Sequence, residues 1–126
     1  MTLVDTDVLI AHLRGTSAAH AWLKARRRES PLSVSVVSVA ELTGGMRSGE
    51  RREVWGLIAD LRVEPITELI ARRAGEFKRI YKRSHSGIDI GDYLIAATAS
   101  ELGLPLATLN VKHFPMFAEL EAPFEV

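Results

Sequence analysis

Short apolar runs alternate with stretches of helical periodicity along the whole chain. Apolar runs, several of them β-branched, predict strands at 2–4, in the first half of 32–39, at 61–66 and at 104–109. Apolar positions spaced three and four apart predict helices at 6–14, 16–28, 38–46, 50–60, 67–83 and 92–102. We also expect a short helical piece within 111–120 and a final strand at 123–126. This alternation predicts an α/β fold, a three-layer sandwich in which a parallel or mostly parallel sheet has helices on both faces.

Four polar residues stand where predicted strands end or helices begin: Asp5, Glu41, Asp92 and Asn110. The carboxyl ends of parallel strands share one edge of a sheet, so these side chains should converge there. Neighbouring carboxylates are difficult to keep charged without a cation among them. Mg²⁺ or Mn²⁺ prefers such oxygen ligands. The pattern therefore predicts a divalent-metal site and phosphoester chemistry.

The first of these residues, Asp5, has the weakest purely structural explanation. It ends an apolar strand, where a buried charge costs several kcal/mol or more unless it is paired. Asp7 is explained well as an acid near a helix N-terminus, and Thr6 or Asp7 can cap that helix. We therefore expect Asp5 to be catalytic and to bind the metal. Thr6 and Asp7 are expected to support it, Thr6 by holding a phosphate or a carboxylate.

The other acids have local alternatives. Residues 38–41 match a capping box, in which Glu41 would reach back to the backbone N–H of Ser38. Asp89 can be the N-cap of the helix that contains Asp92 as its third residue. We favour Glu41 as catalytic, Asp92 as catalytic and metal-binding, and Asp89 as a supporting residue. Asn110 suits a turn as well as a contact to a metal-bound water.

Composition limits the other possibilities. The chain has 126 residues, of which 47% are apolar, and is expected to form one domain over 1–126. It has no cysteine, which excludes disulfides, thiolate zinc sites and thiol nucleophiles. No two of its histidines have the i,i+4 spacing of a helical zinc site, although His113 lies near Asn110. No signal peptide or membrane span is expected, which is compatible with a cytoplasmic protein.

Charge is distributed unevenly although the formal net charge is zero. Residues 68–84 hold six Lys or Arg and two Glu, whereas residues 85–126 hold one Lys and six acids. Further basic clusters lie at 24–28 and 47–52. An acidic site flanked by basic patches suits a polyanionic substrate. The alternative is that the Arg-rich helix faces are simply solvated.

The chain resembles PIN-domain ribonucleases, and in particular the VapC toxins of bacterial toxin–antitoxin pairs. The matching stretches are LVDTDVLI (3–10), SVSVVSVAEL (33–42), DIGDYLIAATASELGLPLATLNVKHF (89–114) and the closing PFEV. They cover essentially the whole chain. The ordered set of an Asp in the first turn, a Glu in A-E-L, an Asp before L-I-A-A and a T-x-N motif is fairly specific.

The resemblance implies a PIN-like fold with acidic positions around Mg²⁺ or Mn²⁺, at Asp5, Glu41 and Asp92. The fourth position falls on Asn110, a departure because many relatives have Asp there, while Asp7 stands where Asn is common. It further implies an endoribonuclease that cleaves structured RNA by a metal-activated water, leaving 5′-phosphate and 3′-hydroxyl ends. The implied partners are RNA, a cognate VapB-type antitoxin and a second copy of the chain in a homodimer.

Three alternatives remain open at this point. LVDTDVLI also resembles the D-x-D signature of haloacid-dehalogenase phosphatases, with Asp5 as nucleophile and Asp7 as acid/base, but such enzymes need a later Lys and a second acidic pair. A receiver-like module would want an Asp after its third strand, and the run at 61–66 provides none. An inactive PIN-like binding module is favoured only by Asn110.

Overall fold

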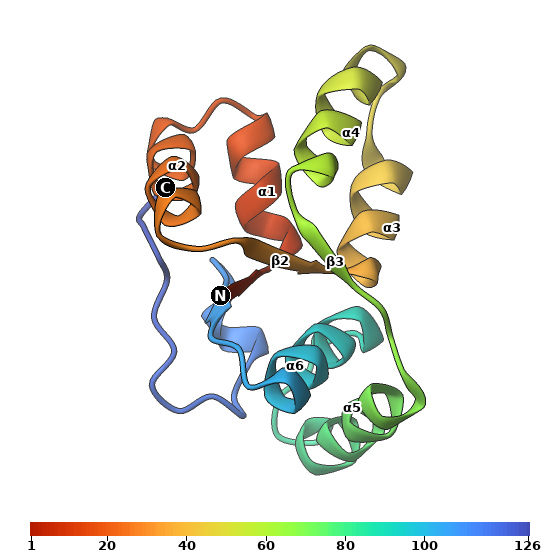
Figure 1. The fold of residues 1–126 in the computed structure, drawn as a ribbon. Coiled ribbons are helices and arrows are strands. Elements are labelled where there is room, and N and C mark those ends of the chain that lie inside the picture. The colour runs from red at the N-terminus through yellow and green to blue at the C-terminus, as the bar shows by residue number, and fades with distance from the viewer.

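The computed structural model describes residues 1–126 and has a four-stranded parallel sheet between two layers of helices (Figure 1). The strands are β1 (Thr2–Val4), β2 (Leu32–Ser35), β3 (Arg62–Glu64) and β4 (Leu106–Ala107). Their order is β3-β2-β1-β4, so the first and last strands are neighbours. This arrangement confirms the α/β sandwich that the sequence predicts.

Six α-helices cover the two faces of the sheet. One layer contains α1 (Thr6–Leu13), α2 (Ser17–Glu29), α3 (Val36–Gly45) and α4 (Arg51–Ala59), with α5 (Glu68–Tyr81) and α6 (Ile90–Leu102) on the other side (Figure 1). Two 3₁₀ turns, η1 (Ser48–Glu50) and η2 (Val111–His113), complete the regular structure. None of the helices is long and apolar enough to cross a membrane.

The alternation of side chains along β1 divides the apolar core in two. Val4 packs with Val8, Leu9 and other residues of the α1–α4 layer, whereas Leu3 packs with Ile95 and other residues of the α6 side. Successive side chains of a strand point to opposite faces, so both faces of this central strand are covered. The polar residue that follows it, Asp5, is thereby held between two apolar layers at the end of the strand.

The start of α3 differs from the prediction and changes the interpretation of Glu41. The helix begins at Val36, directly after β2, and its N-cap is Ser35, whose hydroxyl accepts a hydrogen bond from the Val37 N–H at 3.1 Å. The predicted start at Ser38 is therefore wrong, and so is the capping box of Ser38 with Glu41. Ser38 is an internal helical residue and fully buried, which leaves the Glu41 side chain free for another contact.

The predictions near the C-terminus are also partly wrong. The predicted strand at 104–109 is limited to Leu106–Ala107, and the helical piece within 111–120 is only the 3₁₀ turn Val111–His113. Residues 123–126 form no strand. Phe124 instead packs against Trp22 of α2, with ring centroids 6.3 Å apart. This last segment is short and apolar because it covers a helix, a role that periodicity does not distinguish from a strand.

The ends of α6 agree with the sequence more closely. Gly103 caps the helix in the left-handed conformation, with φ of 64°, as glycine after a helix commonly does. The helix begins at Ile90, two residues before the predicted start, and its N-cap is Asp89. Asp92 is then its third residue, as the predicted cap arrangement requires.

Candidate active site

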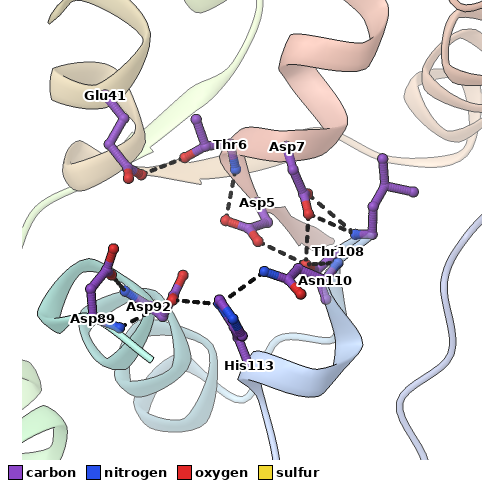
Figure 2. A network of polar contacts seen from close by, with 10 residues as sticks. Asp5, Thr6, Asp7, Glu41, Asp89, Asp92, Thr108, Asn110 and His113 are labelled. Atoms are coloured by element: carbon purple, nitrogen blue, oxygen red, sulfur yellow. Dashed lines mark hydrogen bonds and ion pairs between the residues drawn. The ribbon is translucent and has the colours of Figure 1, made fainter. Parts of the chain in front are cut away.

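The predicted site residues gather at the carboxyl edge of the sheet (Figure 2). Asp5 follows β1 and is the N-cap of α1, where its Oδ1 accepts a hydrogen bond from the Thr6 N–H at 2.8 Å. Its other oxygen, Oδ2, accepts a hydrogen bond from the Thr108 hydroxyl at 2.7 Å. Asp5 is only 5% exposed, so this carboxylate is buried, hydrogen-bonded on both oxygens and without a cationic partner.

Thr108, which is not among the site residues predicted from the sequence, joins the two aspartates of the first turn. Its hydroxyl also lies 3.3 Å from Asp7 Oδ2, and the Leu109 N–H points to both Asp7 oxygens at 3.2 and 3.1 Å. A hydroxyl has one proton to donate, so it serves either Asp5 or Asp7 at a given moment. The T-x-N motif contains this threonine, but nothing local shows that its partner lies 103 residues away in sequence.

Glu41 lies on α3 and reaches across to the start of α1. The Thr6 hydroxyl donates to Glu41 Oε1 at 2.6 Å and lies 2.8 Å from the Ser38 hydroxyl (Figure 2). Ser38 and Glu41 are three residues apart on a helix and therefore share a face. Thr6 thus supports a carboxylate, as one of its two expected roles requires, and Glu41 is held toward Asp5.

The third group lies at the start of α6. The Asp92 N–H donates to Asp89 Oδ1 at 2.9 Å, and Asp92 Oδ2 lies 3.4 Å from the Asp89 N–H. The same Asp92 oxygen lies 2.9 Å from His113 Nδ1, and that nitrogen lies 2.8 Å from Asn110 Nδ2. Figure 2 shows Asp92, His113 and Asn110 in a line that approaches Asp5. Asp89 caps the helix at its exposed side, whereas Asp92 faces the other acids.

Burial and mutual repulsion disfavour the charged forms of these acids. Burial and the negative charges of Asp7 and Asp92 raise the pKa of Asp5 from 3.8 to about 7, although the hydrogen bonds from Thr108 and Thr6 act in the opposite direction. Burial also raises the pKa of Asp7. Burial and the charge of Asp89 raise the pKa of Asp92. Three acids with raised pKa values at one sheet edge indicate a site that a bound cation would stabilise.

The donor set fits a hard divalent ion that keeps part of its water shell. All the acids offer carboxylate oxygens, the ligands that Mg²⁺ and Mn²⁺ prefer. No three His, Asp or Glu side chains lie close enough together to form a complete protein ligand set. Mg²⁺ commonly binds through one or two carboxylates, with water and substrate phosphate filling the remaining positions. Asp5 and Asp92, from opposite sides of the site, are the residues that would hold it.

Comparisons with known proteins agree with this architecture. The family model for the PIN domain matches residues 2–120. Ribonuclease VapC10 of Mycobacterium tuberculosis is 64% identical over 126 residues, covering 100% of this chain and 95% of that protein. The chain belongs to the VapC ribonucleases of the PIN-domain family. Ribonuclease VapC19 of the same species is 39% identical over 125 residues, covering 98% of this chain and 100% of its own.

Solved structures of this family have the same fold. A toxin–antitoxin complex from Klebsiella pneumoniae contains a chain that superposes with a TM-score of 0.82 at 25% identity, covering 100% of both chains. FitAcB from Neisseria gonorrhoeae superposes with a TM-score of 0.74 at 27% identity, covering 90% of this chain and 91% of that one. Family membership confirms the resemblance to VapC toxins and rules out the phosphatase and receiver-like alternatives.

Proposed function

We propose that this protein is a metal-dependent endoribonuclease that acts in the cytoplasm as the toxin of a toxin–antitoxin pair. The observation that carries the proposal is the meeting of Asp5, Asp92 and Glu41 at one sheet edge, with the pKa of the buried Asp5 raised to about 7. Such a site repels a lone phosphodiester and accepts it only together with a cation. The relatives named ribonucleases support RNA as the substrate.

In this proposal Asp5 and Asp92 would hold Mg²⁺ or Mn²⁺. Such an ion, when bound, lowers the pKa of a coordinated water and neutralises charge on the scissile phosphate. Glu41, held by the Thr6 hydroxyl, accepts a hydrogen bond from a water at the site and orients it toward the phosphate. Hydrolysis then leaves a 5′-phosphate and a 3′-hydroxyl.

The remaining residues position these three acids. Asp7 binds the Leu109 N–H and fixes the end of β4 against α1, which places Thr108 on Asp5. Asn110 and His113 hold Asp92 from the other side, and Asp89 fixes the backbone at the start of α6. Asn110 supplies no negative charge, so it would attract a bound ion less strongly than an acid at the same position.

The partners of the proposed toxin are a cognate VapB-type antitoxin and a second copy of the chain. Several structural neighbours are themselves toxin–antitoxin complexes, among them those from Klebsiella pneumoniae and Haemophilus influenzae. An antitoxin that covers the sheet edge would control access to the acids. Sedimentation of the purified chain with and without its antitoxin measures both associations.

RNA cleavage with purified protein tests the catalytic proposal. We expect cleavage with Mg²⁺ or Mn²⁺, none in EDTA, and a loss of at least about 100-fold in Asp5→Ala and Asp92→Ala, since each removes a charged group from the reaction centre. Glu119→Ala removes an exposed acid elsewhere and should leave the rate unchanged. Full activity of either aspartate variant, or activity in EDTA, refutes the proposal. Sequencing the RNA ends after induced expression identifies the target.

A further inference from the structure

A cavity at the other end of the α1–α4 layer combines basic and apolar walls. It has a volume of about 320 Å³ and lies between α1, α2 and the end of α4. Its lining includes Asp60 and Leu61, which directly precede β3. All strands of this sheet are parallel, so the residues that precede a strand lie at the edge opposite to the carboxyl ends. The cavity is therefore separate from the acidic site.

One wall of the cavity is basic. His20, Lys24, Arg27 and Arg28 are spaced at intervals of four, three and one along α2, so they share a side of that helix. His12 faces them from α1. Asp60 is the one acid in the lining, and it already pairs with Arg27 at 3.1 Å. Lys24 and Arg28 are both exposed, and neither forms an ion pair within the chain.

The two histidines of the lining stack on each other, and one of them has a buried nitrogen without a hydrogen-bond partner. The rings of His12 and His20 stack with centroids 5.3 Å apart and an interplanar angle of 9°. Nδ1 of His12 is buried and has no hydrogen-bond partner. Burial, His20 and Arg27 lower the pKa of His12, and Glu53 acts in the opposite direction. Lys24 and Arg28, which have no ion pair, create a positive potential beside these rings that an anion would neutralise.

Three leucines supply the apolar part of the lining, Leu23 on α2, Leu57 on α4 and Leu61 before β3. A cavity with a few convergent cations and an apolar wall suits a ligand with an anionic group and an organic body. Arg and Lys are the residues that proteins use most to bind phosphate oxygens. A carboxylate alone would leave most of this volume and most of the donors unused.

We propose that this cavity binds a phosphate group, with Lys24 and Arg28 contacting its oxygens and the leucines contacting the attached organic part. The phosphate belongs either to the backbone of a bound RNA or to a free nucleotide, and both have the same chemistry at this site. Only the RNA source rests on the proposed function. In that case the cavity holds a phosphate remote from the cleaved bond and increases affinity for long substrates without taking part in the reaction.

The histidine rings themselves report on binding. In EDTA, where no cleavage takes place, NMR spectra of the imidazoles are followed while inorganic phosphate, adenosine 5′-monophosphate or a 2′-O-methylated oligonucleotide is added. We expect shifts at His12 and His20, with His85 on the far side of the molecule unchanged. The double variant Lys24→Ala/Arg28→Ala should weaken binding by roughly 10- to 100-fold, since it removes two charge-assisted contacts.

The matched control is Lys78→Ala/Arg79→Ala, which removes the same charge from exposed positions on α5. It should retain the shifts at His12 and His20. Stronger binding of the oligonucleotide than of the mononucleotide assigns the site to RNA, and the reverse assigns it to a free nucleotide. The proposal is overturned if no phosphate compound shifts these two rings selectively, or if both double variants lose binding equally. Because metal and cleavage are absent, failure here leaves the catalytic proposal intact. Full activity of Asp5→Ala, which would refute the catalytic proposal, leaves phosphate binding at this cavity intact.

Discussion

The ionised Asp5 carboxylate should destabilise the metal-free protein, so Asp5→Asn should be more stable than the wild type in EDTA at pH 8. Burial and the charges of Asp7 and Asp92 raise the pKa of Asp5 from 3.8 to about 7. A shift of about three pH units corresponds to roughly 4 kcal/mol, because each unit is worth about 1.4 kcal/mol. At pH 8 the wild type carries that whole cost in its folded state.

Asparagine can keep most of the local hydrogen bonds. Its oxygen accepts from the Thr6 N–H, and its amide donates to the Thr108 hydroxyl, which then donates to Asp7 instead. Rearranging one hydrogen bond costs about 1 kcal/mol. The expected net gain in free energy of unfolding is therefore about 3 kcal/mol at pH 8, combining the removed charge with that cost.

The pH dependence of unfolding shows whether the charge of Asp5 causes the difference in stability between the wild type and Asp5→Asn. Because the folded pKa of Asp5 lies above the unfolded value of 3.8, proton binding stabilises the fold, fully below about pH 4 and no longer above about pH 7. Between pH 8 and pH 5 the wild type regains about 3 kcal/mol from this group, which the variant cannot regain. The advantage of the variant should therefore nearly disappear at pH 5.

Urea unfolding in EDTA at pH 8 and pH 5, followed by tryptophan fluorescence, measures these values. Glu119→Gln is the control and should change stability by less than about 0.5 kcal/mol at either pH. The reasoning is refuted if Asp5→Asn is no more stable than the wild type at pH 8, or if its advantage is the same at both pH values. Excess Mg²⁺ should stabilise the wild type and leave the variant unchanged.

Three further substitutions test other contacts of the site. Glu41→Gln can still accept the Thr6 hydroxyl bond, so its unfolding midpoint should stay within about 2 °C while its RNA cleavage rate falls at least about tenfold. Thr108→Val removes a hydrogen bond that lowers the pKa of Asp5, so the acidic limb of the rate–pH profile should move to higher pH. The free energy of unfolding of this variant should fall by about 1–3 kcal/mol. Asn110→Asp adds a negative charge near Asp92, so calorimetry should find Mn²⁺ binding tighter by about three- to tenfold; unchanged affinity would exclude Asn110 from the surroundings of the ion.

Hydrophobic patterning predicted the layers of the fold because each buried face leaves a periodic trace in the sequence. It also placed the end of β1 correctly, and Asp5 follows directly from the end of that apolar run. The strands predicted at 61–66 and 104–109 each end two residues earlier in the structure. The start of α3 was misplaced because three serines, Ser33, Ser35 and Ser38, are all good cap residues, and the local pattern fits Ser38 with Glu41. The strand actually continues only to Ser35, a choice made by pairing with β1 and β3.

Contacts between residues far apart in the sequence limited how much of the site could be predicted. Thr6 binds Glu41 across 35 positions, and Asp5 binds Thr108 across 103. Neither pair has a local signature, so a cap explained Glu41 as well as a catalytic role did, and nothing pointed to Thr108. His113, noted only for its nearness to Asn110, contacts Asp92 because the turn Val111–His113 points it back toward α6.

The adjacency of β1 and β4 has a consequence for how the protein is made. Proteins are synthesised from the N-terminus, and contacts between distant residues form only when both partners have emerged. Asp5 and Asp7 precede Thr108 by 103 and 101 residues, and Leu109 and His113 follow Thr108. A nascent chain still attached to the ribosome therefore lacks the groups that orient its first-turn acids. A ribonuclease built in this way can order its acidic site only after the segment with Thr108, Leu109 and His113 has emerged.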